Sequence, residues 1–165
     1  MKVFYKKIVL IVMASFLLYG CNNNLQKGCS SEEFVKILES KGYTVVKDEQ
    51  ILELDVSGQM KKDIDSIHTA KRDYNHEELY VFYDLVDNEE AKEIFDGASI
   101  LKEEMEVTYG KLDFISKADK NYDSVTISNN KFYAYICRVE DKVLMALGAD
   151  KDKENIDKIV KELRY

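Results

Sequence analysis

Residues 122–148 read YDSVTISNNKFYAYICRVEDKVLMALG, and this stretch decides the fold of the chain. Three runs rich in apolar and aromatic residues are separated by two short polar breaks, Asn129-Asn130 and Glu140-Asp141-Lys142. Runs of this kind, separated by two or three polar residues, are typical of strands joined by hairpin turns. Because asparagine tolerates positive φ, the paired asparagines predict a type I′ turn. The stretch therefore predicts a three-stranded antiparallel meander that leads into a helix.

Further strand patterns lie upstream of this meander. Residues 79–85 (LYVFYDL) form a nearly continuous apolar and aromatic run, which is typical of a strand inside a sheet. Weaker patterns predict strands at 43–46, at 51–56 and at about 65–72. Residues 57–72 are ambiguous, because Ser57, Met60, Ile64 and Ile67 have helical spacing, whereas residues 67–70 could pair with 79–85. We favour a short helical or irregular start followed by the strand at about 65–72.

Three helices are predicted from apolar residues spaced three and four positions apart. The first follows Ser30, which has the spacing of a capping box with Glu33, and Gly42 marks its end. The second begins near Asp87 and carries an apolar stripe of Ala91, Ile94, Phe95, Ala98, Leu101 and Met105. The third begins at 150–152 and carries Ile156, Ile159, Val160 and Leu163.

These elements, in a chain of 165 residues without proline, predict one α+β domain over residues 30–165. The 45% share of hydrophobic residues argues against wholesale disorder. We expect an antiparallel sheet with about three helices packed on one face.

The first twenty residues have the pattern of a secretory signal. Residues 1–7 carry three lysines and no acid, and residues 8–18 (IVLIVMASFLL) form an apolar run in which Ser15 is the one polar residue. Eleven helical residues rise only about 16 Å, roughly half of the hydrocarbon core of a bilayer. A cleaved signal is therefore a better interpretation than a permanent membrane span.

Leu18-Tyr19-Gly20-Cys21 resembles the lipobox of bacterial lipoproteins. The resemblance implies that residues 1–20 are removed and that Cys21 receives a diacylglycerol and becomes the new N-terminus. Residues 21–29 then form the lipidated cysteine and a polar tether, and the domain is anchored to the cell membrane on its extracytoplasmic side. An ordinary secretory signal that happens to precede a cysteine is the alternative.

The order of elements over residues 30–165 is also similar to that of small uncharacterised lipoproteins of Gram-positive bacteria. The residues that carry this likeness are Lys41-Gly42-Tyr43 after the first helix and Ile136–Val139 in a late strand. The likeness implies a location in the cell envelope and no particular activity.

The charge balance bears on the partners of the chain. Lys+Arg total 24 and Asp+Glu total 31, a net charge of −7, which argues against nucleic-acid binding because phosphate contacts need a basic face. Removal of residues 1–20 takes away three lysines and no acid, which changes the net charge from −7 to −10. Because of this charge, we expect a monomer that touches the membrane only through its lipid. Its expected partner is an envelope protein or a small ligand.

Residues that could carry out catalysis or hold a metal are few. His68 and His76, the two histidines, have no ligand-pair spacing, and no serine lies in a nucleophile-elbow context. Residues 150–161 lack the glycine and the final glutamate of a calcium loop. We predict no catalytic residue, no metal and no cofactor, and hence a binding module rather than an enzyme. A cell-wall-directed hydrolase or another envelope enzyme is the alternative.

Four aromatic residues are the candidate binding residues. Tyr80 and Phe82 share one face of their strand, and so do Tyr133 and Tyr135. If these rings lie on an open sheet face, they form a platform for a sugar, a peptide or a protein partner. The alternative is that they pack beneath the helices.

Cys29 and Cys137 are a candidate disulfide, because an extracytoplasmic location permits one. Against a bridge, Cys29 lies at the end of the predicted flexible tether, whereas Cys137 has apolar strand neighbours and is adequately explained as a core residue. Cys137 is predicted to be buried in either case.

Overall fold

The computed structural model describes residues 25–47, 64–72, 77–100 and 102–165. The lipobox with Cys21, the strand predicted at 51–56, the region 57–63 and His76 lie outside the described residues. None of the helices within these ranges is long and apolar enough to cross a membrane.

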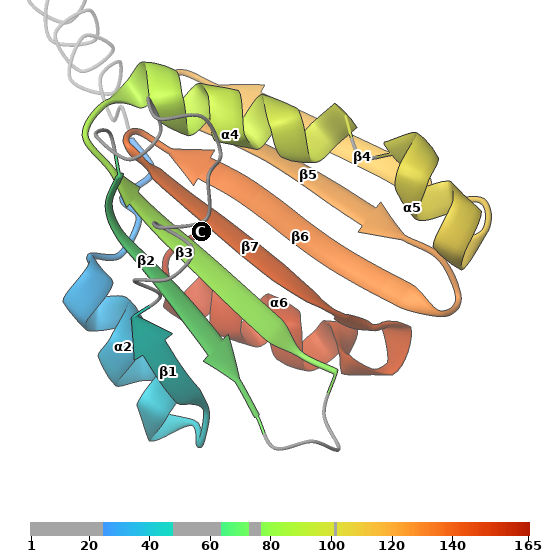
Figure 1. Ribbon diagram of the computed structural model, residues 1–165, viewed down its shortest axis with the longest axis horizontal. Coiled ribbons are helices and arrows are strands. Elements are labelled where there is room, and N and C mark those ends of the chain that lie inside the picture. The colour runs from blue at the N-terminus through green and yellow to red at the C-terminus, as the bar shows by residue number, and fades with distance from the viewer. Residues whose placement is uncertain (1–24, 48–63, 73–76, 101) are drawn as a thin grey trace, which may run out of the picture.

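The described residues form one antiparallel sheet of seven strands (Figure 1). In sequence order the strands are β1 (Thr44–Lys47), β2 (Ile64–Lys71), β3 (Leu79–Leu85), β4 (Asp113–Asp119), β5 (Tyr122–Ser128), β6 (Phe132–Val139) and β7 (Lys142–Ala149). Their order across the sheet is β1-β2-β3-β7-β6-β5-β4, so β3 and β7 join the two halves of the chain. The predicted meander is confirmed as β5, β6 and β7, and the strands predicted at 43–46, 65–72 and 79–85 are confirmed as β1, β2 and β3.

The described helices are α2 (Ser31–Ser40), α4 (Asn88–Ile100), α5 (Lys102–Tyr109) and α6 (Lys153–Glu162), with a 3-10 turn, η1 (Asp150–Asp152), before α6. The capping box at the start of α2 is present as predicted, because Ser30 Oγ accepts from the Glu33 amide and the Glu33 carboxylate accepts from the Ser30 amide. Where one helix is predicted after Asp87, the structure has two, α4 and α5. Leu101, which stands between them, lies outside the described residues.

The prediction that the helices pack on one face is wrong, because they cover both faces of the sheet (Figure 1). Phe34 and Leu38 of α2 and Ile156 and Ile159 of α6 pack with alternate residues of β6 such as Tyr133 and Cys137. Phe95 of α4 packs with the intervening residues Phe132, Ala134 and Ile136. Successive strand residues point to opposite faces, and both sets in β6 are apolar, so each face requires its own cover.

Two local features differ from the sequence predictions. The edge strand β4 was not predicted, because six of its seven residues are exposed and it lacks the apolar alternation of its neighbours. The β5–β6 turn is not of type I′, since neither Asn129 nor Asn130 has positive φ. Instead, Asn129 Oδ1 accepts the amides of Lys131 at 2.8 Å and Phe132 at 2.9 Å, so the side chain supplies bonds that close the turn.

Residues 25–30 pack against the domain, and we call them the N-terminal strap. Gln26 donates from Nε2 to the carbonyl of Arg164 at 2.7 Å, and its own carbonyl accepts from Asn121 Nδ2 at 2.8 Å. Cys29 is completely buried, and a Cβ at Gly28 would lie 2.5 Å from the Tyr165 hydroxyl. The predicted tether at 21–29 is therefore wrong from residue 25 onward, because a glycine and a small thiol fit closely against the C-terminal residues.

Candidate functional site

The four predicted aromatic binding residues do not form an exposed platform. Tyr80 and Phe82 are completely buried, Tyr133 is 3% exposed, and Tyr135 is partly buried. All four lie on the sheet face that α2 and α6 cover, where Phe82 stacks on Phe34 with ring centroids 5.0 Å apart. The sequence correctly placed these rings on one face, but that face is covered, so the alternative of packing beneath the helices is confirmed.

The two described cysteines are free thiols in the same apolar cluster, so no disulfide joins them in this structure. Both are completely buried, which confirms the prediction for Cys137. The strap carries Cys29 into the core, whereas the sequence placed this residue at the end of a flexible tether. Burial raises the pKa of Cys29 to about 12 and also raises the pKa of Cys137.

We expect Cys29 and Cys137 to resist alkylation in the folded chain, because both are buried and the reactive thiolate is disfavoured. Brief treatment with iodoacetamide should label neither residue, whereas treatment in denaturant should label both, as read by peptide mass spectrometry. A cysteine introduced at Val107, which is 89% exposed, serves as the positive control for reagent activity. Rapid native labelling of Cys137 would contradict its place in β6.

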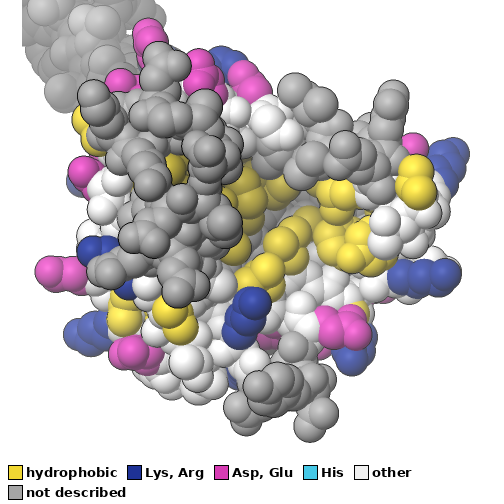
Figure 2. Space-filling model, in the orientation of Figure 1, with side chains coloured by type: hydrophobic (Ala, Val, Ile, Leu, Met, Phe, Trp, Pro, Cys, Tyr) yellow, Lys and Arg dark blue, Asp and Glu magenta, His cyan; other side chains and the backbone are white. Residues whose placement is uncertain are grey.

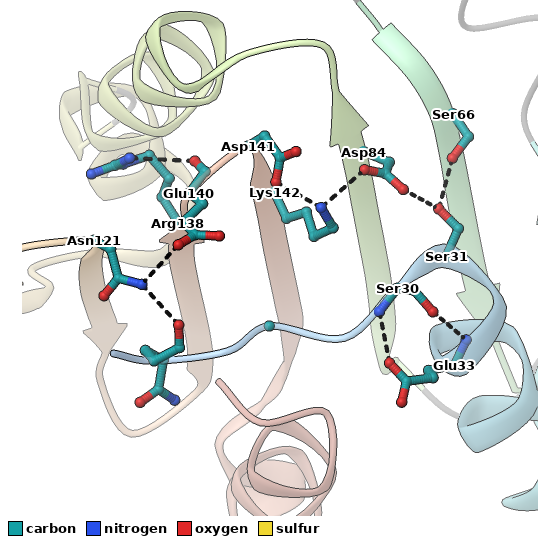
Figure 3. A network of polar contacts seen from close by, with 12 residues as sticks. Ser30, Ser31, Glu33, Ser66, Asp84, Asn121, Arg138, Glu140, Asp141 and Lys142 are labelled. Carbon is teal, nitrogen blue, oxygen red and sulfur yellow. Dashed lines mark hydrogen bonds and ion pairs between the residues drawn. The ribbon is translucent and has the colours of Figure 1, made fainter. Parts of the chain in front are cut away.

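Polar side chains at the ends of the strands join α2 to the sheet (Figure 3). Ser31 Oγ donates to Asp84 Oδ2 at 2.6 Å and lies 2.9 Å from Ser66 Oγ. Lys142 Nζ lies 3.4 Å from Asp84 Oδ1 and 2.6 Å from Asp141 Oδ1. The network thus connects α2 with β2, β3 and the start of β7. These contacts give the polar residues a structural role, because they hold α2 against the sheet.

His68 lies on the same face of β2 as Ser66, so the structure brings a serine, a histidine and an aspartate near one helix. Burial lowers the pKa of His68, and its Nδ1 has no hydrogen-bond partner among the described residues. Ser31 donates instead to a carboxylate, so the serine–imidazole contact of nucleophilic catalysis is not made. Within the described ranges, no cluster of three metal-ligating side chains is present.

A buried carboxylate lies at the opposite end of β3. Glu78 is 3% exposed; it accepts from the Tyr43 hydroxyl, and Asn155 Nδ2 lies 2.8 Å from its Oε1 and 3.0 Å from its Oε2. The Arg72 guanidinium stands 4.6 Å above the Tyr43 ring. Burial raises the pKa of Glu78, and these contacts tie the start of β3 to α6 and to the segment after α2.

The raised pKa of Glu78 predicts a pH-dependent stability. In the folded chain this carboxyl keeps its proton to a higher pH than in the unfolded chain, so the free energy of unfolding falls as pH rises between the two pKa values. Glu78→Gln removes this titration. We expect the variant to gain stability relative to the wild type as pH rises from about 4, the usual pKa of glutamate, toward 7. Urea unfolding of both proteins at several pH values measures the difference, and a constant difference contradicts the prediction.

The sheet face under α4 contains an apolar area that the helix leaves partly uncovered, and we call it the open apolar surface. It consists of Leu79 and Val81 of β3 and Met145 and Leu147 of β7, which are cross-strand neighbours and are only partly buried. Figure 2 shows hydrophobic side chains gathered in a hollow of the sheet below this helix. In the sequence, the odd-numbered residues of 79–85 (LYVFYDL) indicated a second apolar face of this strand. The periodicity did not show which of the two faces a helix would cover.

The chain matches no family model, and no curated protein matches it. Among solved structures, the crystal structure of a GTP-binding regulator from Thermotoga maritima is similar, with 15% sequence identity and a TM-score of 0.46 over 82% of this chain and 84% of that one. What this chain does is therefore inferred from its own sequence and contacts.

Proposed function

We propose that this chain is a membrane-anchored extracytoplasmic lipoprotein whose domain binds an envelope partner rather than transforming a substrate. Leu18-Tyr19-Gly20-Cys21 supports the anchor, because a diacylglycerol on Cys21 supplies the two acyl chains that stable attachment needs. The open apolar surface is the observation that carries the binding role, since partly exposed apolar areas on a sheet are suited to cover by a partner.

The N-terminal strap supports close attachment to the membrane. Leu25 follows Cys21 by four positions, which span at most about 14 Å when extended. Gln26 is already bonded to Asn121 in the β4–β5 turn and to Arg164 after α6. An anchored domain would therefore stay next to the lipid headgroups with this end of the sheet toward the membrane.

A cell-wall-directed hydrolase is supported less well by the contacts of the described residues. Ser31, a serine of the polar network that lies near a histidine and an aspartate, donates a hydrogen bond to Asp84. The buried carboxylate of Glu78 accepts hydrogen bonds from Tyr43 and Asn155. These groups already serve to connect helices with the sheet, and neither lies on the open apolar surface.

The anchor is tested by Cys21→Ser in the producing cells. We expect the wild-type protein to partition into the detergent phase and to carry the acyl mass on Cys21, and the variant to accumulate as precursor or to be released. A variant that still partitions completely as a mature protein would show that the lipid anchor is wrong.

The binding role is tested by photo-crosslinking in intact cells, with a probe placed beside the open apolar surface. We expect one dominant adduct that is lost in Val81→Lys and retained in Val107→Lys, whose site lies on α5. Circular dichroism establishes that both variants are folded. An adduct that survives Val81→Lys as well as the control variant would contradict binding at this surface.

A further inference from the structure

Among the described strands, β4 stands at one edge of the sheet. It pairs with β5 on one side and stands last in the strand order, and no described strand pairs with its other side. Of its seven residues, only Phe114 is partly buried. The outward-facing amide and carbonyl groups of such a strand are a template for another strand.

The charges along this edge differ from those of the whole chain. Residues 111–120 (KLDFISKADK) contain three lysines and two aspartates, whereas the chain carries a net charge of −7. The alternation of the strand places Asp113, Ile115, Lys117 and Asp119 on one face, with Lys111 in line before them. Phe114, Ser116 and Ala118 lie on the other face, which carries no charge within the strand.

We propose that β4 pairs with β4 of a second copy of this chain, antiparallel about a two-fold axis that passes between the two Ile115 residues. In this register Asp113 of each copy faces Lys117 of the other, and Lys111 faces Asp119. Opposite charges therefore flank a central contact between two Ile115 side chains, each of which is 59% exposed in the single chain. Directly opposed pairs of opposite charge stabilise antiparallel strands.

The same charges disfavour the neighbouring register. A pairing centred on Ser116 places Asp113 opposite Asp119 at both ends and Ile115 opposite Lys117, and like charges directly opposed are destabilising. Main-chain hydrogen bonds between the two edges supply affinity, and the side-chain charges select the partner and the register. The sequence predicted a monomer from the total charge, but most of that charge lies away from this edge, and repulsion beyond about 8 Å is screened at physiological ionic strength.

Cysteine cross-linking of the full-length chain in its own membranes tests the register. Directly opposed residues in an antiparallel pair have Cα atoms about 4.5–5.5 Å apart, within the range of a disulfide. Under copper–phenanthroline oxidation we expect Ile115→Cys to give a covalent dimer, and Ala118→Cys, a matched exposed site on the same strand, to give little. Ser116→Cys reports the competing register. The proposal is overturned if Ala118→Cys or Ser116→Cys cross-links faster than Ile115→Cys, or if the adduct contains a different protein.

A charge exchange tests the same pairing without oxidation. Asp113→Lys turns two attractive contacts into lysine–lysine contacts, so we expect the dissociation constant of the dimer to rise about tenfold or more, as measured by sedimentation of the full-length chain in mild detergent. Asp113→Lys combined with Lys117→Asp restores opposite charges and should restore the dimer. Both sites are exposed, and circular dichroism checks that the fold is kept. A monomeric wild type, an unaffected Asp113→Lys or an unrestored exchange variant would each contradict the proposal.

Discussion

Phe82→Ala is expected to lower the free energy of unfolding by about 3–5 kcal/mol, as for other large truncations in a packed core. Phe82 is completely buried in β3 and stacks on Phe34, so the truncation opens a cavity between the sheet and α2. Urea denaturation of the chain from residue 25 onward, followed by circular dichroism, measures the change.

Val107→Ala is the control for this measurement. Val107 is 89% exposed, and its truncation should change the free energy of unfolding by no more than about 0.5 kcal/mol. If Phe82→Ala costs less than about 1 kcal/mol, the packing of α2 on β3 is wrong.

Phe95→Ala is expected to have an effect of similar size, about 3–5 kcal/mol, on the other face of the sheet. Phe95 is 9% exposed and is the residue of α4 that packs with Ile127, Phe132 and Ile136. The same denaturation experiment applies, and a cost below about 1 kcal/mol would mean that α4 does not cover this face. Because the two phenylalanines lie in separate clusters, the costs of Phe82→Ala and Phe95→Ala should add within about 0.5 kcal/mol in the double variant.

Most of the sheet could be predicted from the sequence, because β3, β6 and β7 carry dense apolar runs. The local pattern of β4 could not be recognised in the same way, since this strand is stabilised by pairing with β5 while its side chains remain in solvent. Pairing of this kind depends on residues elsewhere in the chain.

The candidate binding surface shows the same limit of local patterns. Periodicity correctly grouped Tyr80 with Phe82, and Tyr133 with Tyr135, on common faces. It could not assign α2 and α6 to that side and α4 to the other, because the apolar stripe of a helix does not identify the sheet face that receives it. The interpretation that placed the four aromatic residues on an open face therefore chose the face that α2 and α6 cover.

The contacts of the N-terminal strap also set the order in which the molecule can fold. Gln26 and Arg164 are separated by 138 positions, so this contact closes a loop that contains nearly all of the described chain. Closing so long a loop has a high entropic cost before the intervening sheet exists, and the strap has few bonds of its own with which to offset it. We therefore expect docking of residues 25–30 onto Asn121 and Arg164 to be the closing step of folding.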